Sequence, residues 1–375
     1  MINIISSLKN KHPKNLVFFV TNSFGELDYL GPFISMINKY SNYKIKLIFI
    51  NYGIYKQFKN CEYFNKLFLI LKVECKKILF SYDTSDKLNY NLFLKRLNKL
   101  KNFLFFIFSF FEITYYYLKN DIIFIESSKL TKSHLLISIL NKFIKKNIVF
   151  FPHTSKRFYA NQSTQKNNIL NDVPVLISSQ LEINYYKPAG FENFIMTEYP
   201  PNNTVWHEII NKNFNSPYNQ TEYVCIFLKG LKLNEQNENE RFQDLLALAI
   251  ESIKLVDENV SIILKKHPRE FRRREESLII QKTLKKYNFF NIKNIKFSDF
   301  PNFILSKFSK YNLILDNSAI FSSHAANKNS FYLFSKNDHL LNNIKKYNLP
   351  FAGNKIELIN KLKKLNINKI DQINK

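Results

Sequence analysis

The chain has 375 residues, of which 45% are hydrophobic and 23% charged, values typical of a folded globular protein rather than a disordered one. Six glycines and eleven prolines exclude collagen-like and linker-dominated architectures, and the length allows two domains of ordinary size. The formal net charge is +25, but the lysines are scattered and accompany much Asn, Ile, Phe and Tyr, as an AT-rich genome encodes. We therefore expect no nucleic acid as partner and keep an anionic membrane surface as an alternative one.

The cysteines and the amino-terminal residues indicate the compartment. Cys61, Cys75 and Cys225 are far apart and form no C-x-x-C pair, which argues against a disulfide framework and a zinc site. The first residues contain no apolar stretch of signal-peptide length. These features predict a cytoplasmic protein.

Strand-like and helix-like stretches alternate through the first half of the chain. Residues 15–22 are a continuous apolar run, as expected of a strand that is buried on both faces. Further strands are expected over 44–51, 76–81, 121–127, 147–153, 174–179 and 193–200. Because helical patterns separate most of these strands, the pattern predicts a parallel, doubly wound sheet.

Residues 102–118, NFLFFIFSFFEITYYYL, form a long apolar stretch that is close to the shortest length able to span a bilayer. Glu112 lies inside this stretch, and three tyrosines lie near its end. This composition favours a core helix of the first domain over a membrane span. The alternative is a helix that lies on the inner face of the cytoplasmic membrane.

The residues after 200 predict a domain boundary. Residues 200–203 and 213–221 are polar and rich in turn formers, so we expect a linker over 201–222 between domains 1–200 and 223–375.

The strand-helix pattern then resumes. Strands are expected over 223–229, 260–267, 294–299, 311–317 and 330–334, with the polar tract 233–240 as a loop. The predicted fold class is α/β, with two Rossmann-like doubly wound domains that face each other across a cleft, and a site at the carboxyl ends of both sheets.

The first candidate site follows the strand over 260–267. His267 ends this strand, Pro268 fits the first turn of a helix, and Arg269 can hold a phosphate through two hydrogen bonds. A helix N-terminus at this place attracts anions, because its backbone amides and dipole add to the side-chain charge. The alternative is a solvated corner whose charges are incidental.

The second candidate site follows the strand over 311–317. Ser318 is expected near the N-cap of the next helix, and Ser322 and Ser323 are alternatives to it. A plain N-cap serine is the simpler explanation, but two anion-binding strand ends in one parallel sheet converge on one place. Lys229, which ends the first strand of the second domain, is a third candidate for the donor phosphates.

His267-Pro268-Arg269-Glu270, followed about 50 residues later by NSAIFSSHA, resembles the C-terminal domain of GT-B glycosyltransferases. Bacterial sialyltransferases and polysialyltransferases of this fold pair a His-Pro motif with a later serine or threonine motif that holds the donor phosphate. Capsule and lipopolysaccharide enzymes and CDP-glycerol glycerophosphotransferases have similar strings. The resemblance implies that His267 and Ser318 contact donor phosphate, with a nucleotide sugar as substrate and no metal.

The catalytic base is less clearly marked. The sialyltransferases carry two acidic residues followed by glycine, and this string is absent here. The nearest match is the loop after the first strand, where Gly25 would allow close backbone approach and Glu26 or Asp28 would supply the carboxylate. His153, at the end of a later strand, is a further candidate for the base or for an acceptor contact. Thr154 follows it, where UDP-N-acetylglucosamine 2-epimerases have a glutamate.

These features predict a glycosyltransferase that moves a sugar from a CMP-, UDP- or GDP-linked donor to a bacterial surface glycan or glycolipid: capsule, lipopolysaccharide or O-antigen. The second domain would bind the nucleotide sugar and the first the glycan or lipid-linked acceptor. The alternatives are a CDP-glycerol-type polyol-phosphate transferase and a non-catalytic glycan- or lipid-binding protein on a degenerate GT-B scaffold. The sequence shows no metal-ligand spacing, Walker loop, G-x-S-x-G or G-x-G-x-x-G, so we expect no metal or other cofactor.

Overall fold

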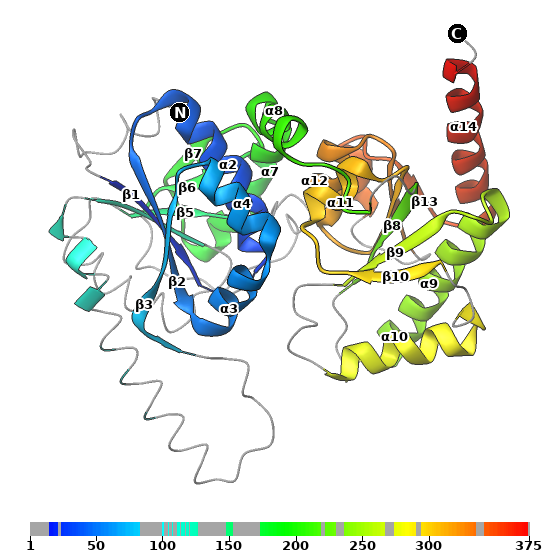
Figure 1. Ribbon diagram of the computed structural model, residues 1–375, viewed down its shortest axis with the longest axis horizontal. Coiled ribbons are helices and arrows are strands. Elements are labelled where there is room, and N and C mark those ends of the chain that lie inside the picture. Colours follow the sequence, from blue (N-terminus) through cyan, green and yellow to red (C-terminus); the bar gives the residue numbers. More distant parts are fainter. Residues whose placement is uncertain are drawn as a thin grey trace. The chain divides into compact units, whose positions relative to one another are not determined.

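The computed structural model describes residues 15–21, 24–82, 100, 104, 107, 111–112, 114–116, 118–119, 121–126, 148–152, 173–218, 222–229, 236–266, 274–289, 294–334 and 341–373. The chain divides into two compact units, Met1–Trp206 and His207–Lys375. Each unit contains one parallel sheet with helices packed on it (Figure 1).

Unit 1 contains a seven-stranded parallel sheet in the order β3-β2-β1-β4-β5-β6-β7. Its elements are β1 (Asn15–Val20), α2 (Glu26–Tyr40), β2 (Lys44–Asn51), α3 (Tyr52–Asn60), α4 (Glu62–Ile70), β3 (Glu74–Tyr82), β4 (Ile122–Glu126), β5 (Ile148–Phe151), β6 (Val175–Ile177), α7 (Gln180–Tyr186), the 3₁₀ turn η2 (Lys187–Ala189), β7 (Phe194–Met196) and the 3₁₀ turn η3 (Pro200–Asn202). Helix α8 (Thr204–Asn213) crosses the boundary between the units.

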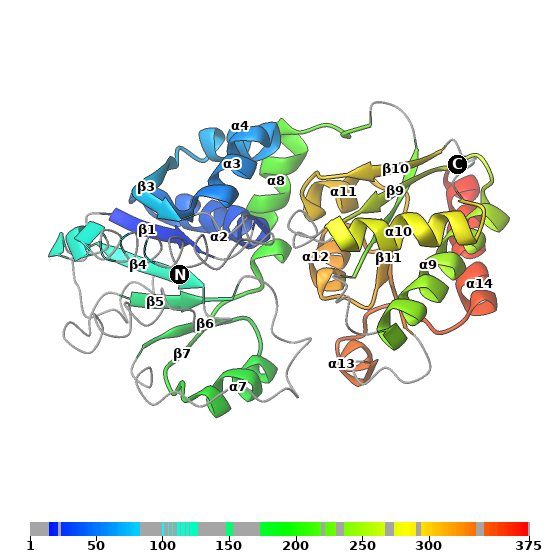
Figure 2. The same cartoon turned by 90° about the horizontal axis from the view of Figure 1, so that it is seen from below.

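Aromatic side chains fill both faces of this sheet. On one face Phe18 of β1 stacks on Phe124 of β4, with ring centroids 4.5 Å apart, and meets Phe33 of α2 edge to face. On the other face Phe19 packs with Tyr186 of α7 in a second cluster. These contacts place α2 and α7 on opposite faces of the sheet; Figure 2 draws α3 and α4 near β3 and α7 near β7. Burial on both faces explains why β1 reads as a continuous apolar run.

Unit 2 contains a six-stranded parallel sheet in the order β10-β9-β8-β11-β12-β13. Its elements after α8 are β8 (Tyr223–Phe227), α9 (Gln236–Val256), β9 (Ser261–Lys265), α10 (Arg274–Lys286), β10 (Ile295–Ser298), α11 (Asn302–Phe308), β11 (Asn312–Leu315), α12 (Ala319–Ala326), β12 (Ser330–Leu333), α13 (Leu341–Lys346), β13 (Phe351–Ala352) and α14 (Lys355–Ile373).

The helices of unit 2 also lie on both faces of the sheet. Helices α9, α10 and α14 share one apolar cluster with alternate residues of the strands, such as Val224 and Ile226. Helices α11 and α12 pack on the opposite side, where the Tyr223 hydroxyl donates to Leu305 O at 2.9 Å. The predicted α/β class with two Rossmann-like doubly wound domains is therefore confirmed.

Each predicted strand overlaps one of β1 to β12, but β8 ends at Phe227 rather than at Lys229, and β9 ends at Lys265 rather than at His267. Three further points need correction. The two-residue strand β13 was not predicted, because Phe351–Ala352 is too short to show a pattern. The tract 233–240 was expected to be a loop, but Gln236 onwards belongs to α9, whose polar first turn faces water. The expected linker 201–222 contains α8, which buries Trp206 and Ile210.

The described residues within 102–118 are helical, as predicted. Tyr116 is buried in the core of unit 1, but several apolar neighbours of this residue are exposed. Within the described residues, no helix is long and apolar enough to cross a membrane.

Candidate functional site

In each sheet the order in which the strands are added reverses between two neighbouring strands. In unit 2, charged side chains lie at this switch point. Each sheet has the order 3-2-1-4-5-6 in its first six strands, so the chain runs outward from β1 and β4 in unit 1 and from β8 and β11 in unit 2. Ligands of doubly wound sheets bind outside the carboxyl ends of the strands at such a switch point. Lys229 follows β8 and Asp316 follows β11, so these residues occupy that place in unit 2.

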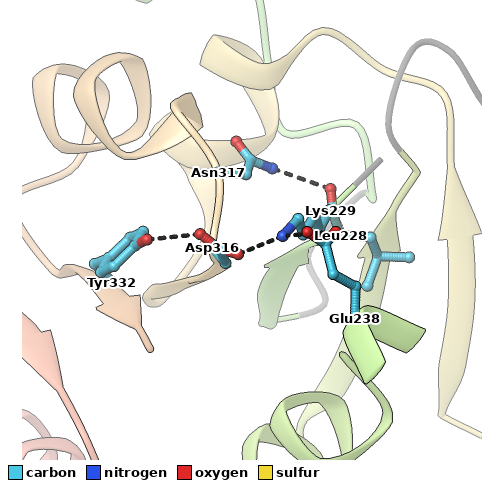
Figure 3. A network of polar contacts seen from close by, with 6 residues as sticks. All are labelled: Leu228, Lys229, Glu238, Asp316, Asn317 and Tyr332. Atoms are coloured by element: carbon cyan, nitrogen blue, oxygen red, sulfur yellow. Dashed lines mark hydrogen bonds and ion pairs between the residues drawn. The ribbon is translucent and has the colours of Figure 1, made fainter. Parts of the chain in front are cut away.

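Asp316 connects three strand ends through its carboxylate (Figure 3). The Lys229 ammonium donates to Oδ2 at 2.5 Å, and the hydroxyl of Tyr332 on β12 donates to Oδ1 at 2.9 Å. The Asp316 side chain is 10% exposed and that of Lys229 25%, so the ion pair is largely withdrawn from water. Such a pair is sensitive to the loss of either partner, because the remaining charge would be left poorly solvated.

Asn317 extends the connection to the backbone. Its Nδ2 donates to the carbonyl of Leu228 at 3.0 Å (Figure 3). Its Oδ1 accepts from the amide of Ala319 at 2.5 Å. Asn317 therefore holds the start of α12 against the end of β8. Ser318 is the N-cap residue of α12, as the sequence predicts, but its own side chain makes no capping hydrogen bond; the side chain that accepts from a first-turn amide belongs to Asn317.

The turn that presents these side chains has an uncommon backbone conformation. Asp316 has φ = 43°, in the left-handed region that costs most residues free energy but that Asp and Asn adopt more readily. Strained residues persist where the surroundings hold them, and they cluster at functional sites. Here the Asp316 carboxylate is held by Lys229 and Tyr332.

Glu238, in the first turn of α9, lies 3.4 Å from the Lys229 ammonium. Burial by itself lowers the pKa of Lys229, but the carboxylates of Asp316 and Glu238 outweigh burial and raise the pKa above its ordinary value. Lys229 is therefore a firmly held cation. Together the three side chains carry one positive and two negative charges, so they do not form an anion site by themselves.

The three predicted serines are placed differently. Ser318 lies half-buried at the start of α12. Ser322 donates its hydroxyl to the Ala319 carbonyl at 3.1 Å within the helix, and Ser323 is fully buried. Of the three, Ser318 has the position expected of a phosphate contact, whereas burial withdraws Ser323 from any ligand at the surface.

The remaining predicted donor residues, His267, Pro268 and Arg269, lie outside the described residues, as does His153. The strand that precedes the first three is described. β9 ends at Lys265, which is paired in register with Phe227 of β8. The segment after β9 therefore starts at the same edge of the sheet as Lys229.

In unit 1 the structure corrects the prediction for Glu26. This residue was expected to project as a catalytic carboxylate, but it is fully buried, and its Oε2 accepts from the amide of Thr21 at 2.9 Å. The bond closes the loop between β1 and α2. Gly25 has φ = −65° and ψ = −16°, a conformation open to any residue, so the backbone there does not require glycine.

Asp28 is half-buried in the first turn of α2. It lies close enough to Tyr63 of α4 to act on its charge: burial first, and then the Asp28 carboxylate, raise the pKa of the Tyr63 hydroxyl well above its ordinary value. Among the described candidates for the base, Asp28 is thus the more accessible carboxylate.

Sequence reasoning missed two kinds of residue. Asp316, Asn317 and Tyr332 form the network in unit 2; the signal for Asp316 and Asn317 was their position after the apolar strand β11, whereas Tyr332 lies within β12 and gave no signal of its own. Glu126 ends β4 in unit 1 and is fully buried at the switch point of that sheet. A carboxylate at the end of an apolar strand is the signal that could have pointed to it.

One hollow of about 440 Å³ also lies in unit 2. Its described lining includes Arg241 and Asp244 of α9, Phe334 after β12 and Gly353 after β13. Lys229, Asp316 and Ser318 are not among the described lining residues, but Phe334 follows β12 and Gly353 follows β13, at the same edge of the sheet as the network around Asp316. Within the described residues, no group of three His, Cys, Asp or Glu side chains could hold a metal ion.

No protein-family model matches the sequence, and no curated protein matches it either. Similar folds occur among solved structures. The UDP-GlcNAc 2-epimerase of Methanocaldococcus jannaschii, in complex with UDP-GlcNAc and UDP, is 15% identical with a TM-score of 0.57, over 93% of this chain and 92% of that one.

Two further structures have the same fold. A Listeria monocytogenes protein, provisionally assigned as a UDP-N-acetylglucosamine 2-epimerase, is 9% identical with a TM-score of 0.58, over 96% of this chain and 89% of that one. Anabaena HepE, in complex with UDP and glucose, is 12% identical with a TM-score of 0.50, over 94% of this chain and 89% of that one. At these identities the likeness concerns the fold, and it shows that the chain has the two-unit GT-B fold.

Proposed function

We propose that the protein is a glycosyltransferase that moves a sugar from a nucleotide-linked donor to a bacterial surface glycan or glycolipid. Unit 2 would bind the donor and unit 1 the acceptor. The observation that carries this proposal is the Asp316 network, which brings Lys229 and the start of α12 together at the switch point of a parallel sheet. Phosphate groups bind at such helix starts because backbone amides and the helix dipole favour negative charge.

The carboxylates around Lys229 imply that a donor phosphate site needs positive charge from further residues. The ammonium carries three N–H donors, and two carboxylates, Asp316 and Glu238, lie within 3.4 Å of it. A donor phosphate at this place would compete with Glu238, the more exposed of the two at 41%. Further positive charge would come from His267 and Arg269 in the segment after β9, together with the start of α12.

Because a donor phosphate and Glu238 would compete for Lys229, substitutions at these residues should change nucleotide affinity in opposite directions. Glu238→Gln removes one negative charge near Lys229, so it should tighten nucleotide binding about two- to fivefold, in line with an exposed ion pair of up to 1 kcal/mol. Lys229→Met should weaken binding, and His267→Ala should cost roughly 1.5–3 kcal/mol of binding free energy as a lost charge-assisted contact. Lys282→Met, on the exposed side of α10, is the matched control.

The nucleotide can be identified first by titration of the purified chain with CMP, CDP, UDP and GDP. A ligand that binds only the folded state raises the unfolding temperature, and calorimetry then gives its affinity. Uridine nucleotides come first in the series, because two of the similar structures were solved with UDP. Binding of none of the four, or binding unaffected by Lys229→Met and His267→Ala, would contradict the proposed donor site.

Inverting transfer needs a base that removes the proton of the acceptor hydroxyl. We assign this role to Asp28 or His153, because Glu26 is fully buried and already bound to Thr21 N. Asp28→Asn should then lower kcat strongly while donor affinity stays unchanged. Equal activity of wild type and Asp28→Asn would leave His153 as the candidate.

Product analysis separates the alternatives. A glycosyltransferase adds the mass of a sugar to the acceptor, whereas a CDP-glycerol-type transferase adds a polyol phosphate. Conversion of UDP-GlcNAc to an isomer without any acceptor would instead indicate an epimerase, the activity named for the Methanocaldococcus protein. Donor binding without turnover of any donor would indicate a binding protein.

A further inference from the structure

The described helical residues between 100 and 118 present an apolar and exposed surface on unit 1, drawn as short teal pieces in Figures 1 and 2. At roughly 100° per residue, side chains spaced by three or four residues share one side of a helix, here within an arc of about 80°. We call this set the apolar stripe; it consists of Leu100, Leu104, Ile107, Phe111, Tyr115 and Leu118. The exposed fractions are 58% for Leu100, 45% for Leu104, 63% for Phe111, 51% for Tyr115 and 71% for Leu118.

The other side of the same helix is anchored. Tyr116 is only 2% exposed and belongs to the core cluster of unit 1, where its ring lies 6.4 Å from that of Phe19. The ammonium groups of Lys46 and Lys76 lie 5.6 Å and 5.0 Å from the centre of the Tyr116 ring. Among the described residues between 100 and 119, Tyr116 is the buried one, and no member of the apolar stripe belongs to the core cluster.

Lysines adjoin the end of the apolar stripe. Lys119 donates to the hydroxyl of Tyr115 and lies 4.1 Å from the centre of its ring. Lys119 first, and then Lys46 and Lys76, lower the pKa of Tyr115, so all three cations act on this ring. The acidic neighbours are Glu74, 4.0 Å from Lys46, and Glu112, 3.7 Å from Lys76.

The sequence around the apolar stripe has the same charge bias. Between residues 87 and 119 it contains one acidic residue, Glu112, and six basic residues. The basic residues are Lys87, Lys95, Arg96, Lys99, Lys101 and Lys119. A helix with an apolar side and basic flanks is typical of segments that lie in the interface of an anionic membrane.

We propose that the apolar stripe lies on the surface of an anionic lipid bilayer, with its leucines and Phe111 in the boundary between headgroups and acyl chains and the adjoining lysines on lipid phosphates. The chemistry of both parts fits: apolar side chains leave water, and lysines extend their ammonium groups to the headgroups. A second copy of the chain fits less well, because each copy carries a net charge of +25 and lysines beside its own apolar stripe. The proposal uses no residue of the donor site in unit 2.

The test is binding of the full chain to vesicles, measured by flotation. Vesicles of phosphatidylcholine alone are compared with vesicles that also contain phosphatidylglycerol. We expect binding to the second kind, and at least about tenfold weaker partitioning of the double variant Phe111→Ser/Leu118→Ser, which loses two large apolar contacts. The matched control is Leu69→Ser/Leu255→Ser, which removes two exposed leucines elsewhere, 78% and 62% exposed.

The charge requirement is tested separately. Lys76→Gln/Lys119→Gln should weaken binding to the anionic vesicles, and salt raised from about 0.1 M to 0.5 M should do the same by screening. Lys212→Gln/Lys282→Gln, exposed lysines of unit 2, is the control. Circular dichroism and nucleotide titration should show an unchanged fold and donor site in every variant.

Three outcomes would overturn the proposal. One is equal partitioning of Phe111→Ser/Leu118→Ser and wild type. Another is equal binding to neutral and anionic vesicles. The third is no vesicle binding at all, together with a wild-type dimer that the stripe variant converts to a monomer by light scattering, which would identify a second copy as the partner.

Discussion

The junctions β1–α2 and β11–α12 occupy the same place in their sheets and use their carboxylates in opposite ways. At the first, Glu26 is fully buried and accepts a hydrogen bond from a backbone amide, Thr21 N. At the second, Asp316 is partly exposed and binds the side chains of Lys229 and Tyr332 from two other strands. The first carboxylate closes its own loop, whereas the second joins three strand ends.

Two other junctions show that the first arrangement is a general structural device in this chain. Glu182 in the first turn of α7 is fully buried and accepts from Ser178 N at 2.6 Å, and Glu357 in the first turn of α14 accepts from Gly353 N at 3.0 Å. In each case the carboxylate in the first turn of a helix reaches back and accepts from an amide of the loop that precedes the helix, much as the glutamate of a capping box does. Asp316 differs, because its carboxylate binds side chains of other strands and not a backbone amide of its own loop. This difference in partners identifies Asp316 as a functional candidate, whereas a carboxylate at such a junction does not by itself.

The largest expected effect is the loss of Glu26. Glu26→Ala leaves the buried amide of Thr21 without its acceptor and opens a cavity, so we expect the free energy of unfolding of unit 1 to fall by about 2–4 kcal/mol. Trp206 is the single tryptophan, is buried, and lies against Gly31 of α2, so its fluorescence reports this unfolding.

Glu26→Gln keeps an acceptor oxygen and is the control for Glu26→Ala. It should recover most of the lost stability and, if Glu26 is structural, retain activity. A stable but inactive Glu26→Gln variant would restore Glu26 as the catalytic base and break the comparison.

The next effect concerns Asp316→Asn. Asparagine accepts the left-handed backbone and can keep the bond from Tyr332, so the variant isolates the charge opposite Lys229. We expect the free energy of unfolding of unit 2 to fall by about 1–3 kcal/mol, because Lys229 loses its closest partner in a largely buried pair. Hydrogen exchange of β8 and β11 amides would measure it.

The matched control is Asp257→Asn, which breaks the ion pair of Asp257 with Lys310. This pair is 2.9 Å long and similarly shielded, with side chains 26% and 15% exposed, but Lys310 lies just before β11, at the amino-terminal edge of the same sheet. Both variants should lose similar stability, but only Asp316→Asn should change nucleotide affinity. Equal nucleotide affinity of the two variants would show that the Asp316 network has a structural role only.

A smaller effect is expected at Glu357, the half-buried one of these first-turn carboxylates. Glu357→Ala should cost about 0.5–1 kcal/mol, as a lost helix cap does. Partial burial raises the pKa of Glu357, but the Gly353 amide and Lys361 outweigh it and lower the pKa overall. The contribution is therefore present above the unfolded pKa and is lost as the pH falls through the lower folded pKa.

The lowered pKa of Glu357 in the folded protein sets the expected pH dependence of stability. Stability curves of wild type and Glu357→Ala should differ at pH 7 and converge towards pH 3. Curves that remain parallel over this range would show that the Glu357 charge does not matter.

The smallest effect concerns His324 near the end of α12. Burial, followed by the charge of Lys328, lowers the pKa of His324. The unfolded chain therefore takes up this proton first, so the stability is present above the unfolded pKa near 6.5 and declines as the pH falls below it. His324→Gln should flatten the wild-type stability curve between pH 7 and 5, measured by urea denaturation; an unchanged slope would contradict the buried placement.

Much of the fold was predictable from local patterns. Continuous apolar runs such as β1 and β8 arise because both faces of a parallel sheet are covered, and their alternation with helical patterns predicts the doubly wound class. The element β13 and helix α8 were missed for opposite reasons. Two residues are too few to show a period, and the turn-forming residues around α8 concealed the helix that buries Trp206.

The candidate site was predictable only in part. The sequence by itself determined that Lys229 and Ser318 would follow buried strands, and parallel strands place such residues at one edge of their sheet. Only the tertiary structure decided which carboxylate closes its own loop and which one holds a lysine. That choice depends on contacts between residues far apart in the sequence, such as Lys229 with Asp316, and no local pattern records such contacts.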